Sequence, residues 1–441
     1  MVMKKIAGCF VCSLAAVFVL SQSSLSDTLL KNISNGTFGF EGYLRSGSGT
    51  NLYGGKMEAF QAPGAPVKYR LGNEQETYLE TVFTNTGAHT GPKDARTKLQ
   101  VRLAYKTQQN QTEDNYISGP PSPSSIDTIV FDKVCLREAF GTMDNFIEGM
   151  PNAKVWAGQR FYRLPQLEIS DFWWSDMSGY GGGFEDLNAG IGKLNIAYIG
   201  YSANDLTLKT DNGRYLKSNL HLMLKDIGGE KAKASVWING GNMAGGISGT
   251  SVYPTLTGID LGAMVVSGDE KAGNQMSLQY GRGINTSLSA AAGISPMGSE
   301  NRDWTFRFTN MMNKKVNDVL SYQAVGVLQL WRKDNDTSAD KNWASFGIRP
   351  VIGLSKNLAL ELEPGIDYVY DPSNNYDTSL FKLTAALRLA PSAEFAAHPR
   401  FRMFATYAAW GNGFVNQSIG GTAFNNKNYG LNAGLQCEHW W

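Results

Sequence analysis

Apolar and polar residues alternate along the last thirteen residues of the chain, and this pattern limits the possible folds more than any other feature. One face carries Leu431, Ala433, Leu435, Cys437 and Trp441, with His439 as its single polar member. The opposite face carries Asn432, Gly434, Gln436, Glu438 and Trp440. A segment of about ten residues with a lipid-facing and a water-facing side is the unit of a transmembrane β-barrel. Because the run ends on an aromatic residue with no turn after it, we expect the closing strand of an outer-membrane barrel.

The same alternation recurs along the whole chain and predicts an all-β fold. Examples are Leu99, Val101 and Leu103 against Lys98, Gln100 and Arg102, and Phe381, Leu383 and Leu387 against Lys382, Thr384 and Arg388. Such segments, separated by turns rich in Gly, Asn, Asp and Ser, predict an antiparallel transmembrane β-barrel of about eighteen strands. Charges at inward positions require a wet interior, and barrels of roughly 16 to 18 strands enclose an aqueous channel. A large secreted all-β protein with an exterior polar face is the alternative.

The amino-terminal residues have the features of an export signal. Lys4 and Lys5 precede an apolar run that ends at Leu20, and the small residues before Asp27 suit cleavage. We therefore divide the chain into a signal peptide (1–26), a short amino-terminal segment (27–36) and a single β-barrel (37–441). No later stretch of about eighteen apolar residues predicts a membrane-spanning helix.

Charge and cysteine content exclude several functional classes. Without residues 1–26 the chain has 38 basic and 39 acidic residues, and it has no basic run that would bind nucleic acid. Cys135 and Cys437 remain, and their spacing matches no metal site or disulfide framework. Glu76 and Glu80 would lie about 13 Å apart along a strand, beyond the usual carboxylate separations of glycoside hydrolases. We predict no nucleic acid, no metal, no cofactor and no enzymatic activity.

Several longer motifs carry a resemblance to a known family. They are Phe40-Glu-Gly-Tyr-Leu-Arg-Ser-Gly, KYRLGNE (68–74), Arg137-Glu-Ala, WAGQRFY (156–162), DFWW (171–174), GIRP (347–350), FATYAAW (404–410) and Trp440-Trp441. In this order, and over nearly all of the chain after the signal, the sequence resembles the maltoporin-type carbohydrate-selective porins. The resemblance implies an eighteen-stranded barrel with an inward-folded constriction loop, embedded in the lipid of the bacterial outer membrane as a homotrimer. It also implies facilitated diffusion of maltose- or maltodextrin-like oligosaccharides.

The resemblance further implies two rows of sugar-binding residues along the lumen. The aromatic track would consist of Tyr43, Tyr78, Trp173, Phe395 and Trp440. The polar track would consist of Arg45, Arg70, Glu80, Arg137 and Asp171. A pyranose ring stacks its apolar face on aromatic rings, and its hydroxyl rim needs hydrogen-bond donors and acceptors. Alternation independently places Tyr43, Tyr78 and Trp440 inward, and it places Arg70 and Glu76 on the face of Tyr78 in an expected strand from Val67 to Phe83.

The sequence departs from the family at the constriction. Leu164, Gln166 and Glu168 occupy positions where the family has Arg, Asp and His, and Trp173 replaces a tyrosine. We expect the constriction loop to extend through the glycine-rich stretch from Ser178 to Gly183. Within transport the alternative is a general diffusion porin, whose lumen arginines only order the internal field. The track aromatics could instead belong to the interfacial girdles that barrels carry on the outer wall.

Overall fold

The computed structural model describes residues 37–87, 95–107, 134–202, 216–243, 246–248, 251–253, 255–269, 272–290, 302–334 and 336–441. The expected signal peptide and amino-terminal segment therefore lie outside the described residues, as does the polar stretch from Gln108 to Ser125, which its composition predicts to be an external loop.

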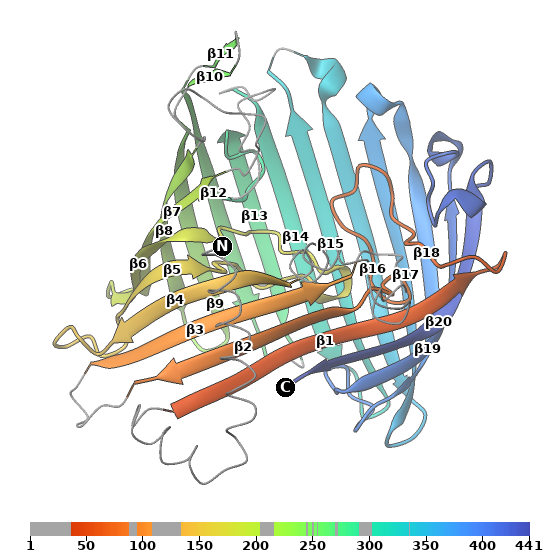
Figure 1. Cartoon of the computed structure of the whole chain (residues 1–441), viewed down its shortest axis with the longest axis horizontal. Coiled ribbons are helices and arrows are strands. Elements are labelled where there is room, and N and C mark those ends of the chain that lie inside the picture. Colours follow the sequence, from red (N-terminus) through yellow and green to blue (C-terminus); the bar gives the residue numbers. More distant parts are fainter. Residues whose placement is uncertain are drawn as a thin grey trace, which may run out of the picture.

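Eighteen antiparallel strands form one closed sheet, which confirms the expected barrel (Figure 1). The strands are β1 (Thr37–Asn51), β2 (Tyr78–Thr86), β3 (Arg96–Lys106), β4 (Val134–Asp144), β5 (Lys154–Arg160), β6 (Gly179–Asn188), β7 (Lys193–Ser202), β8 (Leu216–Gly228), β9 (Ala232–Met243), β12 (Leu256–Ser267), β13 (Asn274–Gly283), β14 (Trp304–Lys315), β15 (Leu320–Arg332), β16 (Lys341–Gly353), β17 (Leu358–Asp371), β18 (Tyr376–Leu389), β19 (Arg400–Trp410) and β20 (Tyr429–Trp440). The hairpin of β10 (Gly246–Ser248) and β11 (Ser251–Tyr253) is separate. Short 3₁₀ helices are η1 (Glu168–Ser170), η2 (Thr337–Ala339), η3 (Pro372–Asn374), η4 (Asn412–Phe414) and η5 (Thr422–Phe424). Strands β1 and β20 close the barrel, with Tyr43 opposite Trp440. In the part of the chain that the structure describes, no helix is long and apolar enough to cross a membrane.

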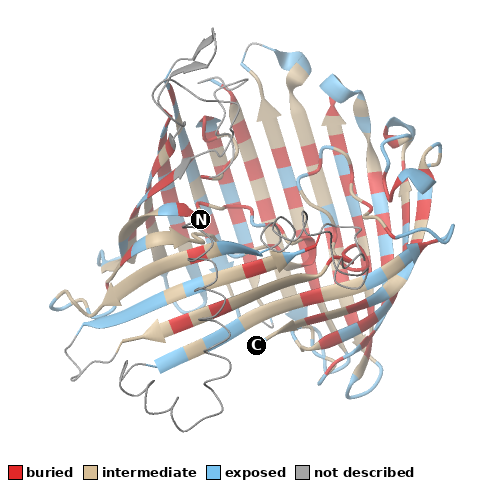
Figure 2. Ribbon diagram, viewed as in Figure 1, coloured by how far each residue is buried: buried red, intermediate tan, exposed pale blue. Residues whose placement is uncertain are grey.

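Burial along the strands is the inverse of burial in a soluble protein (Figure 2). On β18, Lys382 is 1% exposed, whereas its neighbour Leu383 is 38% exposed. On β20, Asn432 is buried and Leu435 is exposed. Inward positions thus form a polar interior, and outward positions form an apolar belt that suits lipid.

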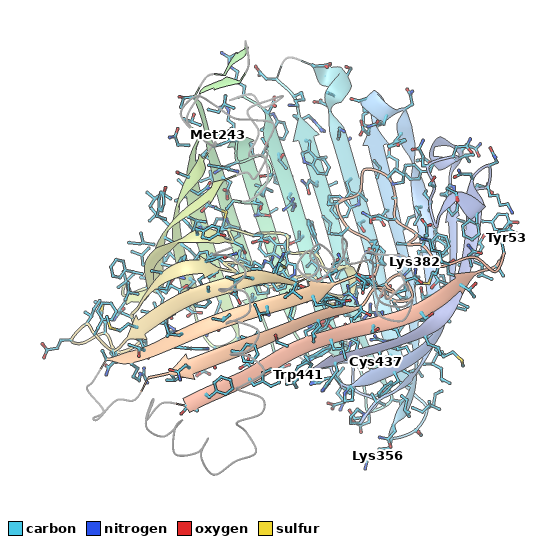
Figure 3. The ribbon with its side chains drawn as sticks, in the orientation of Figure 1. Tyr53, Met243, Lys356, Lys382, Cys437 and Trp441 are labelled. Atoms are coloured by element: carbon cyan, nitrogen blue, oxygen red, sulfur yellow. The ribbon has the colours of Figure 1, made fainter. Side chains whose placement is uncertain are left out.

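Loop length distinguishes the two ends of the barrel. Residues 229–231 and 354–357 are short turns at one end, whereas longer segments such as 411–428 leave from the other. Outer-membrane barrels have short turns at the periplasmic end and longer loops outside. In Figure 3, Lys356 marks the short-turn end and Met243 marks the long-loop end.

Residues 56–77, which follow β1, fold into the lumen and pack against β16–β20. The Leu71 N–H donates to Glu363 on β17 at 2.9 Å, and the Leu71 carbonyl accepts from the Thr384 hydroxyl on β18 at 2.9 Å. Tyr69 and Ser345 share a hydrogen bond of 2.8 Å between their hydroxyls. We call residues 56–77 the first inward segment.

The expectation of a strand that begins at Val67 is wrong, because β2 begins only at Tyr78. Gly72 interrupts the extended backbone with a φ of +63°, and a Cβ at this position would lie 2.2 Å from the Thr406 hydroxyl. The backbone therefore turns against the opposite wall, where only glycine fits. Arg70 reaches the lumen as part of this turn and not as a strand residue.

Residues 161–178, the second inward segment, cross the lumen between β5 and β6. Trp174 is fully buried, and its ring lies 6.0 Å from that of Trp237 on β9. The Phe172 ring lies 5.6 Å from that of Trp343 on β16. These contacts anchor the segment to the far wall, so the expected inward-folded loop is present.

The glycines near Ser178 are not part of this loop, in contrast to our expectation. Strand β6 begins at Gly179 and belongs to the wall. A Cβ on Gly181 would lie 1.9 Å from the Tyr198 carbonyl oxygen of β7. The glycines therefore allow β6 and β7 to approach each other closely, which is a common reason for glycine inside a strand.

A third short segment, residues 284–290, completes the filling of the lumen. The Lys217 ammonium of β8 donates to the carbonyls of Ile284 and Ser289 at 2.8 and 3.0 Å. These three segments occupy the lumen face of β8–β18, and two interior cavities lie along β1–β6.

Candidate functional site

A cavity of about 390 Å³ lies between β1–β4 and the two inward segments. Its lining comprises Tyr43, Arg45, Arg70, Tyr78, Glu80, Lys106, Arg137, Arg163, Gln166, Asp171 and Trp173. We call it the track pocket, since eight of the ten residues proposed for the two tracks line it. The four wall strands β1–β4 and both inward segments thus bring together residues that are far apart in sequence.

A second cavity of about 680 Å³ continues from the track pocket toward the short-turn end. Its walls include Thr86, Arg96 and Lys154, at the periplasmic ends of β2, β3 and β5. We call this cavity the vestibule. The two cavities share Glu80, Arg163 and Trp173 as lining residues, so they are adjacent, and we call the succession of the two cavities the route.

Cross-strand register places the aromatic rings of the track pocket side by side. Tyr43 is opposite Glu80 on β2 and opposite Trp440 on β20, so the three share the lumen face. The Tyr43 ring lies 6.0 Å from the Tyr78 ring and 6.4 Å from the Trp440 ring. The rings form a row inside the barrel and do not belong to an outer girdle.

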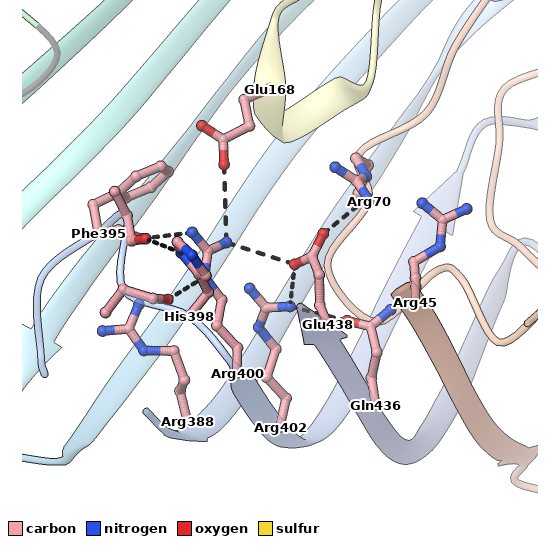
Figure 4. A network of polar contacts seen from close by, with 12 residues as sticks. Arg45, Arg70, Glu168, Arg388, Phe395, His398, Arg400, Arg402, Gln436 and Glu438 are labelled. Atoms are coloured by element: carbon pink, nitrogen blue, oxygen red, sulfur yellow. Dashed lines mark hydrogen bonds and ion pairs between the residues drawn. The ribbon is translucent and has the colours of Figure 1, made fainter. Parts of the chain in front are cut away.

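Two arginines, each paired with a carboxylate, lie beside this row of rings. Arg45 pairs with Glu76 at 2.6 Å, and Arg70 pairs with Glu438 at 3.1 Å. The Tyr43 hydroxyl accepts from Arg70 at 2.8 Å and donates to Glu438 at 2.9 Å, which fixes the ring orientation. Figure 4 shows Glu438 between Arg70 on one side and Arg400 and Arg402 on the other.

Glu74 joins these two arginines from behind the pocket. Its carboxylate lies 3.1 Å from Arg45 and 3.0 Å from Arg70. Burial alone raises the pKa of Glu74, but the two guanidinium groups outweigh burial and hold the pKa below its ordinary value. The carboxylate is therefore charged and preorganises both donors.

A stack of an arginine and two aromatic rings narrows the route between the track pocket and the vestibule. The Arg163 guanidinium carbon lies 3.8 Å from the centre of the Phe161 ring and 4.9 Å from that of Trp173. Arg163 also donates to Asp176 at 2.8 Å. Trp173 is 37% exposed, unlike its fully buried neighbour Trp174, and it is the tryptophan that faces the route.

A β-bulge in β4 lets two neighbouring residues, Arg137 and Glu138, both face the lumen. On β4, Leu136 is opposite Leu103 and Glu138 is opposite Arg102, so Arg137 has no partner on β3. Both Arg137 and Glu138 therefore line cavities, although neighbouring strand residues normally face opposite sides. The Arg137 guanidinium lies over the Phe161 ring at 5.1 Å.

The remaining two track residues lie outside the track pocket. Trp440 extends the row, since its ring stacks on His398 at 4.3 Å and lies 4.7 Å from the Arg400 guanidinium carbon. Phe395 is in the turn before β19, and its ring lies 6.0 Å from the same guanidinium. The Arg400 guanidinium thus contacts both Phe395 and Trp440, and Figure 4 shows Phe395 beside Arg400.

The departures from the family have defined places. Leu164 packs against the buried apolar cluster of the second inward segment, and Gln166 lines the track pocket. Glu168 lies 3.8 Å from Arg400. Of these three side chains, only the Gln166 amide lines the track pocket, with Trp173 beside it.

Three residues of this region were missed by sequence reasoning. Lys106 continues the inward series of Gln100 and Arg102 on β3, so extending the alternation by two steps would have found it. Arg163 and His398 lie in irregular segments, for which no period applies. Their ring contacts depend on long-range packing that the sequence does not display.

Comparison with known proteins identifies the family. The sequence model of the LamB porin matches residues 38–441. This chain belongs to the LamB porin family. Together with the closed barrel of eighteen strands, membership makes this porin a multi-pass β-barrel of the outer membrane and a diffusion channel, not an enzyme. The alternative of a secreted all-β protein is thereby excluded.

Similar solved structures are also porins. An anion-selective porin from Comamonas acidovorans has 9% identity and a TM-score of 0.45, with 92% of this chain and 100% of that chain covered. OpdK from Pseudomonas aeruginosa, solved with vanillate, has 9% identity and a TM-score of 0.48, with coverage of 92% and 99%. OmpF from Salmonella typhi, solved with daunomycin, has 10% identity and a TM-score of 0.46, with coverage of 92% and 98%.

Proposed function

We propose that this porin conducts oligosaccharides by facilitated diffusion along the aromatic row, with maltodextrin-like chains as the reference substrate. The observation that carries the proposal is the row of Tyr78, Tyr43 and Trp440, with centroid spacings of 6.0 and 6.4 Å. A sugar chain presents alternating apolar faces and hydroxyl rims, which such a row and its neighbouring charges can bind repeatedly. Several similar weak sites in succession let a substrate both enter and leave.

The polar residues beside the row support the same proposal. Arg45 and Arg70 are held by carboxylates, so they present fixed donors and need no reorganisation when a sugar arrives. Glu80 accepts from the Tyr78 hydroxyl and pairs with Arg102 at 2.6 Å, which fixes an acceptor beside the second ring. In this proposal, Trp173 forms the opposite wall and Asp171 provides a further acceptor. Arg137 and Phe395 complete the two tracks of the proposal.

The test is a planar-bilayer recording in which maltooligosaccharides are titrated while the ion current is measured. The proposal predicts saturable block, because a bound sugar fills the route at Trp173. Conductance without block by maltooligosaccharides or by other sugars would support the general diffusion porin instead. Channel formation itself follows from family membership, so the experiment isolates the sugar selectivity.

We also propose that three copies associate, as expected from the family resemblance. Unheated electrophoresis in SDS, followed by heating, measures the assembly. A band at three times the monomer mass that heating converts to the monomer supports the homotrimer, whereas monomers in unheated samples contradict it.

A further inference from the structure

The track pocket contains two cations that have no carboxylate partner. Arg45, Arg70 and Arg163 are each paired with a carboxylate at 3.1 Å or less. Among the residues that the structure describes, Lys106 and Arg137 have no carboxylate within 4.0 Å, yet both line the pocket. We call Lys106 and Arg137 the unpaired cations.

The position of the unpaired cations relative to the aromatic row is fixed by the sheet. Lys106 is directly opposite Tyr78, so both side chains project from neighbouring strands on the lumen face. Arg137 lies on the next strand, at the bulge opposite Arg102 and Leu103. The bulge lets Arg137 and its neighbour Glu138 both face the lumen, so Arg137 and Lys106 line the same pocket from adjacent strands.

Arg137 is also incompletely satisfied. Among the described residues, the Arg137 Nε is buried and has no hydrogen-bond partner, while one face of the guanidinium rests on Phe161 at 5.1 Å. A buried donor without a partner is costly, and a planar guanidinium matches a carboxylate with two parallel hydrogen bonds. A carboxylate anion would therefore satisfy this donor and also balance the guanidinium charge.

The acids of the pocket do not supply that anion. Glu80 is held by Arg102 at 2.6 Å and by the Tyr78 hydroxyl. Glu74 and Glu438 are buried behind the lining and paired with arginines. Asp171 lines the pocket but forms no ion pair within 4.0 Å among the described residues.

We propose that the preferred substrate of this porin is an acidic oligosaccharide, whose carboxylate binds Arg137 and Lys106 while a sugar ring stacks on Tyr78. This inference rests on the proposed function, because it assigns the chemical class of sugar that the same pocket binds. A neutral maltodextrin stacks on the row and offers Arg137 and Lys106 hydroxyl groups only, without a negative charge to pair with either cation. The acidic sugar is bound more tightly for that reason.

The experiment compares trigalacturonate with its fully methyl-esterified form, which has the same backbone without charge, and with maltotriose as a neutral reference. Current block is recorded in about 1 M KCl, where screening limits charge effects to about 3 Å. We expect the wild-type channel to be half-blocked by trigalacturonate at a concentration on the order of a hundredfold lower than by the ester, since the carboxylate makes two charge-assisted contacts, each worth on the order of tenfold.

Variants assign this preference to the unpaired cations. Arg137→Gln and Lys106→Gln should each raise the half-blocking concentration of trigalacturonate on the order of tenfold. Lys106→Gln should leave block by the ester unchanged, whereas Arg137→Gln, which alters a polar-track residue, should weaken block by the ester to a smaller extent than block by trigalacturonate. Arg137→Lys, which keeps the charge, should restore part of the preference. Lys98→Gln is the matched control, because Lys98 lines the vestibule and not the track pocket. Block by the neutral sugars reports that each variant folds.

Each outcome distinguishes the inference from the proposed function. Equal block by trigalacturonate and its ester would overturn the acidic-sugar inference and leave the sugar channel in place. A wild-type preference that both glutamine variants retain would also overturn it. If none of the three sugars blocks the current, the proposed function and the inference both fail.

Discussion

The lumen faces of β16–β20 and of β2–β4 both carry charged side chains, but they use them differently. On the first face, Glu361 pairs with Arg388 at 3.0 Å and with Arg402 at 2.7 Å, and all three are buried. On the second face, Lys106 and Arg137 have no carboxylate partner among the described residues and line an open cavity. The first inward segment covers one face and leaves the other accessible.

This difference teaches that lumen charge alone does not mark a binding site. Charged residues at alternate positions are what any water-filled barrel requires. A ligand can exchange only with groups that are both accessible and unsatisfied, whereas a buried closed network stabilises the wall. Ion pairing and exposure of the charged side chains therefore distinguish the structural lumen face of β16–β20 from the candidate site on β2–β4.

We call the lumen face of β16–β20 the packed face and that of β2–β4 the open face. The largest expected effect is on the packed face. Glu361→Gln leaves Arg388 and Arg402 without their shared carboxylate in a buried site, which costs about 3–5 kcal/mol for broken buried pairs. We expect a lower urea midpoint for unfolding, while sugar block of the folded channel is retained. Lys98→Gln on the open face is the control, since Lys98 is exposed and forms no ion pair with the described residues. Equal midpoints for the two variants would remove the distinction between the faces.

The next effect concerns the aromatic row on the open face. Trp440→Ala and Tyr78→Ala each remove one stacking surface, worth about 1 kcal/mol or roughly fivefold in affinity. Half-blocking sugar concentrations should rise accordingly, and open-channel conductance should remain nearly unchanged. Trp441→Ala is the matched control, because Trp441 is 41% exposed and its ring lies 5.8 Å from that of the exposed Phe40, away from the aromatic row. The aromatic-track assignment is wrong if both track variants keep wild-type block.

The barrel was predictable from the sequence because alternation is a local property. Leu383 and Lys382 are assigned to opposite faces by their spacing alone, and the structure agrees. The inward path of residues 67–77 was not predictable, since Gly72 turns only where Thr406 lies close by. Sequence period could not reveal this contact between residues more than three hundred positions apart.

The candidate site divides in the same way. Tyr43 and Tyr78 follow the strand period, so alternation places them in the lumen before any resemblance is used. At Arg137 a bulge interrupts the strand period, so Arg137 and its neighbour Glu138 both face the lumen, whereas alternation alone places only one of the two there. The absence of a carboxylate partner is a property of the folded pocket alone.

A smaller effect is expected from Arg70, which lies where the two faces meet. Arg70→Ala removes a lumen cation and leaves Glu74 and Glu438 with fewer counter-charges. The route becomes more negative, so we expect the reversal potential in a salt gradient to shift toward cation selectivity. Lys356→Ala in a periplasmic turn should not change the reversal potential. A shift toward anions, or none, would contradict the placement of Arg70 beside the conducting route.

The smallest expected effect is a pH dependence of ion selectivity that originates at Asp171. Burial raises the pKa of the Asp171 carboxyl above its ordinary range, although Arg70 opposes the increase, whereas the pKa of Glu74 is lowered. As the pH falls, Asp171 therefore takes up its proton before Glu74 does, and the track pocket becomes more positive. Selectivity should shift toward anions on acidification, and the reversal potential measures the shift.

Asp171→Asn tests the origin of this dependence, because asparagine is neutral at every pH. The variant should show at neutral pH the selectivity that the unmodified channel reaches on acidification, with a reduced shift thereafter. Asp318→Asn is the control, since the Asp318 side chain is 98% exposed in a periplasmic turn. If Asp171→Asn keeps the full shift, another acid is responsible for it. If the shift is lost, the track pocket contains an acid, Asp171, that titrates separately from Glu74, whose carboxylate is held by Arg45 and Arg70. Ion pairing then distinguishes the accessible acid from the buried one, as it distinguishes the two faces.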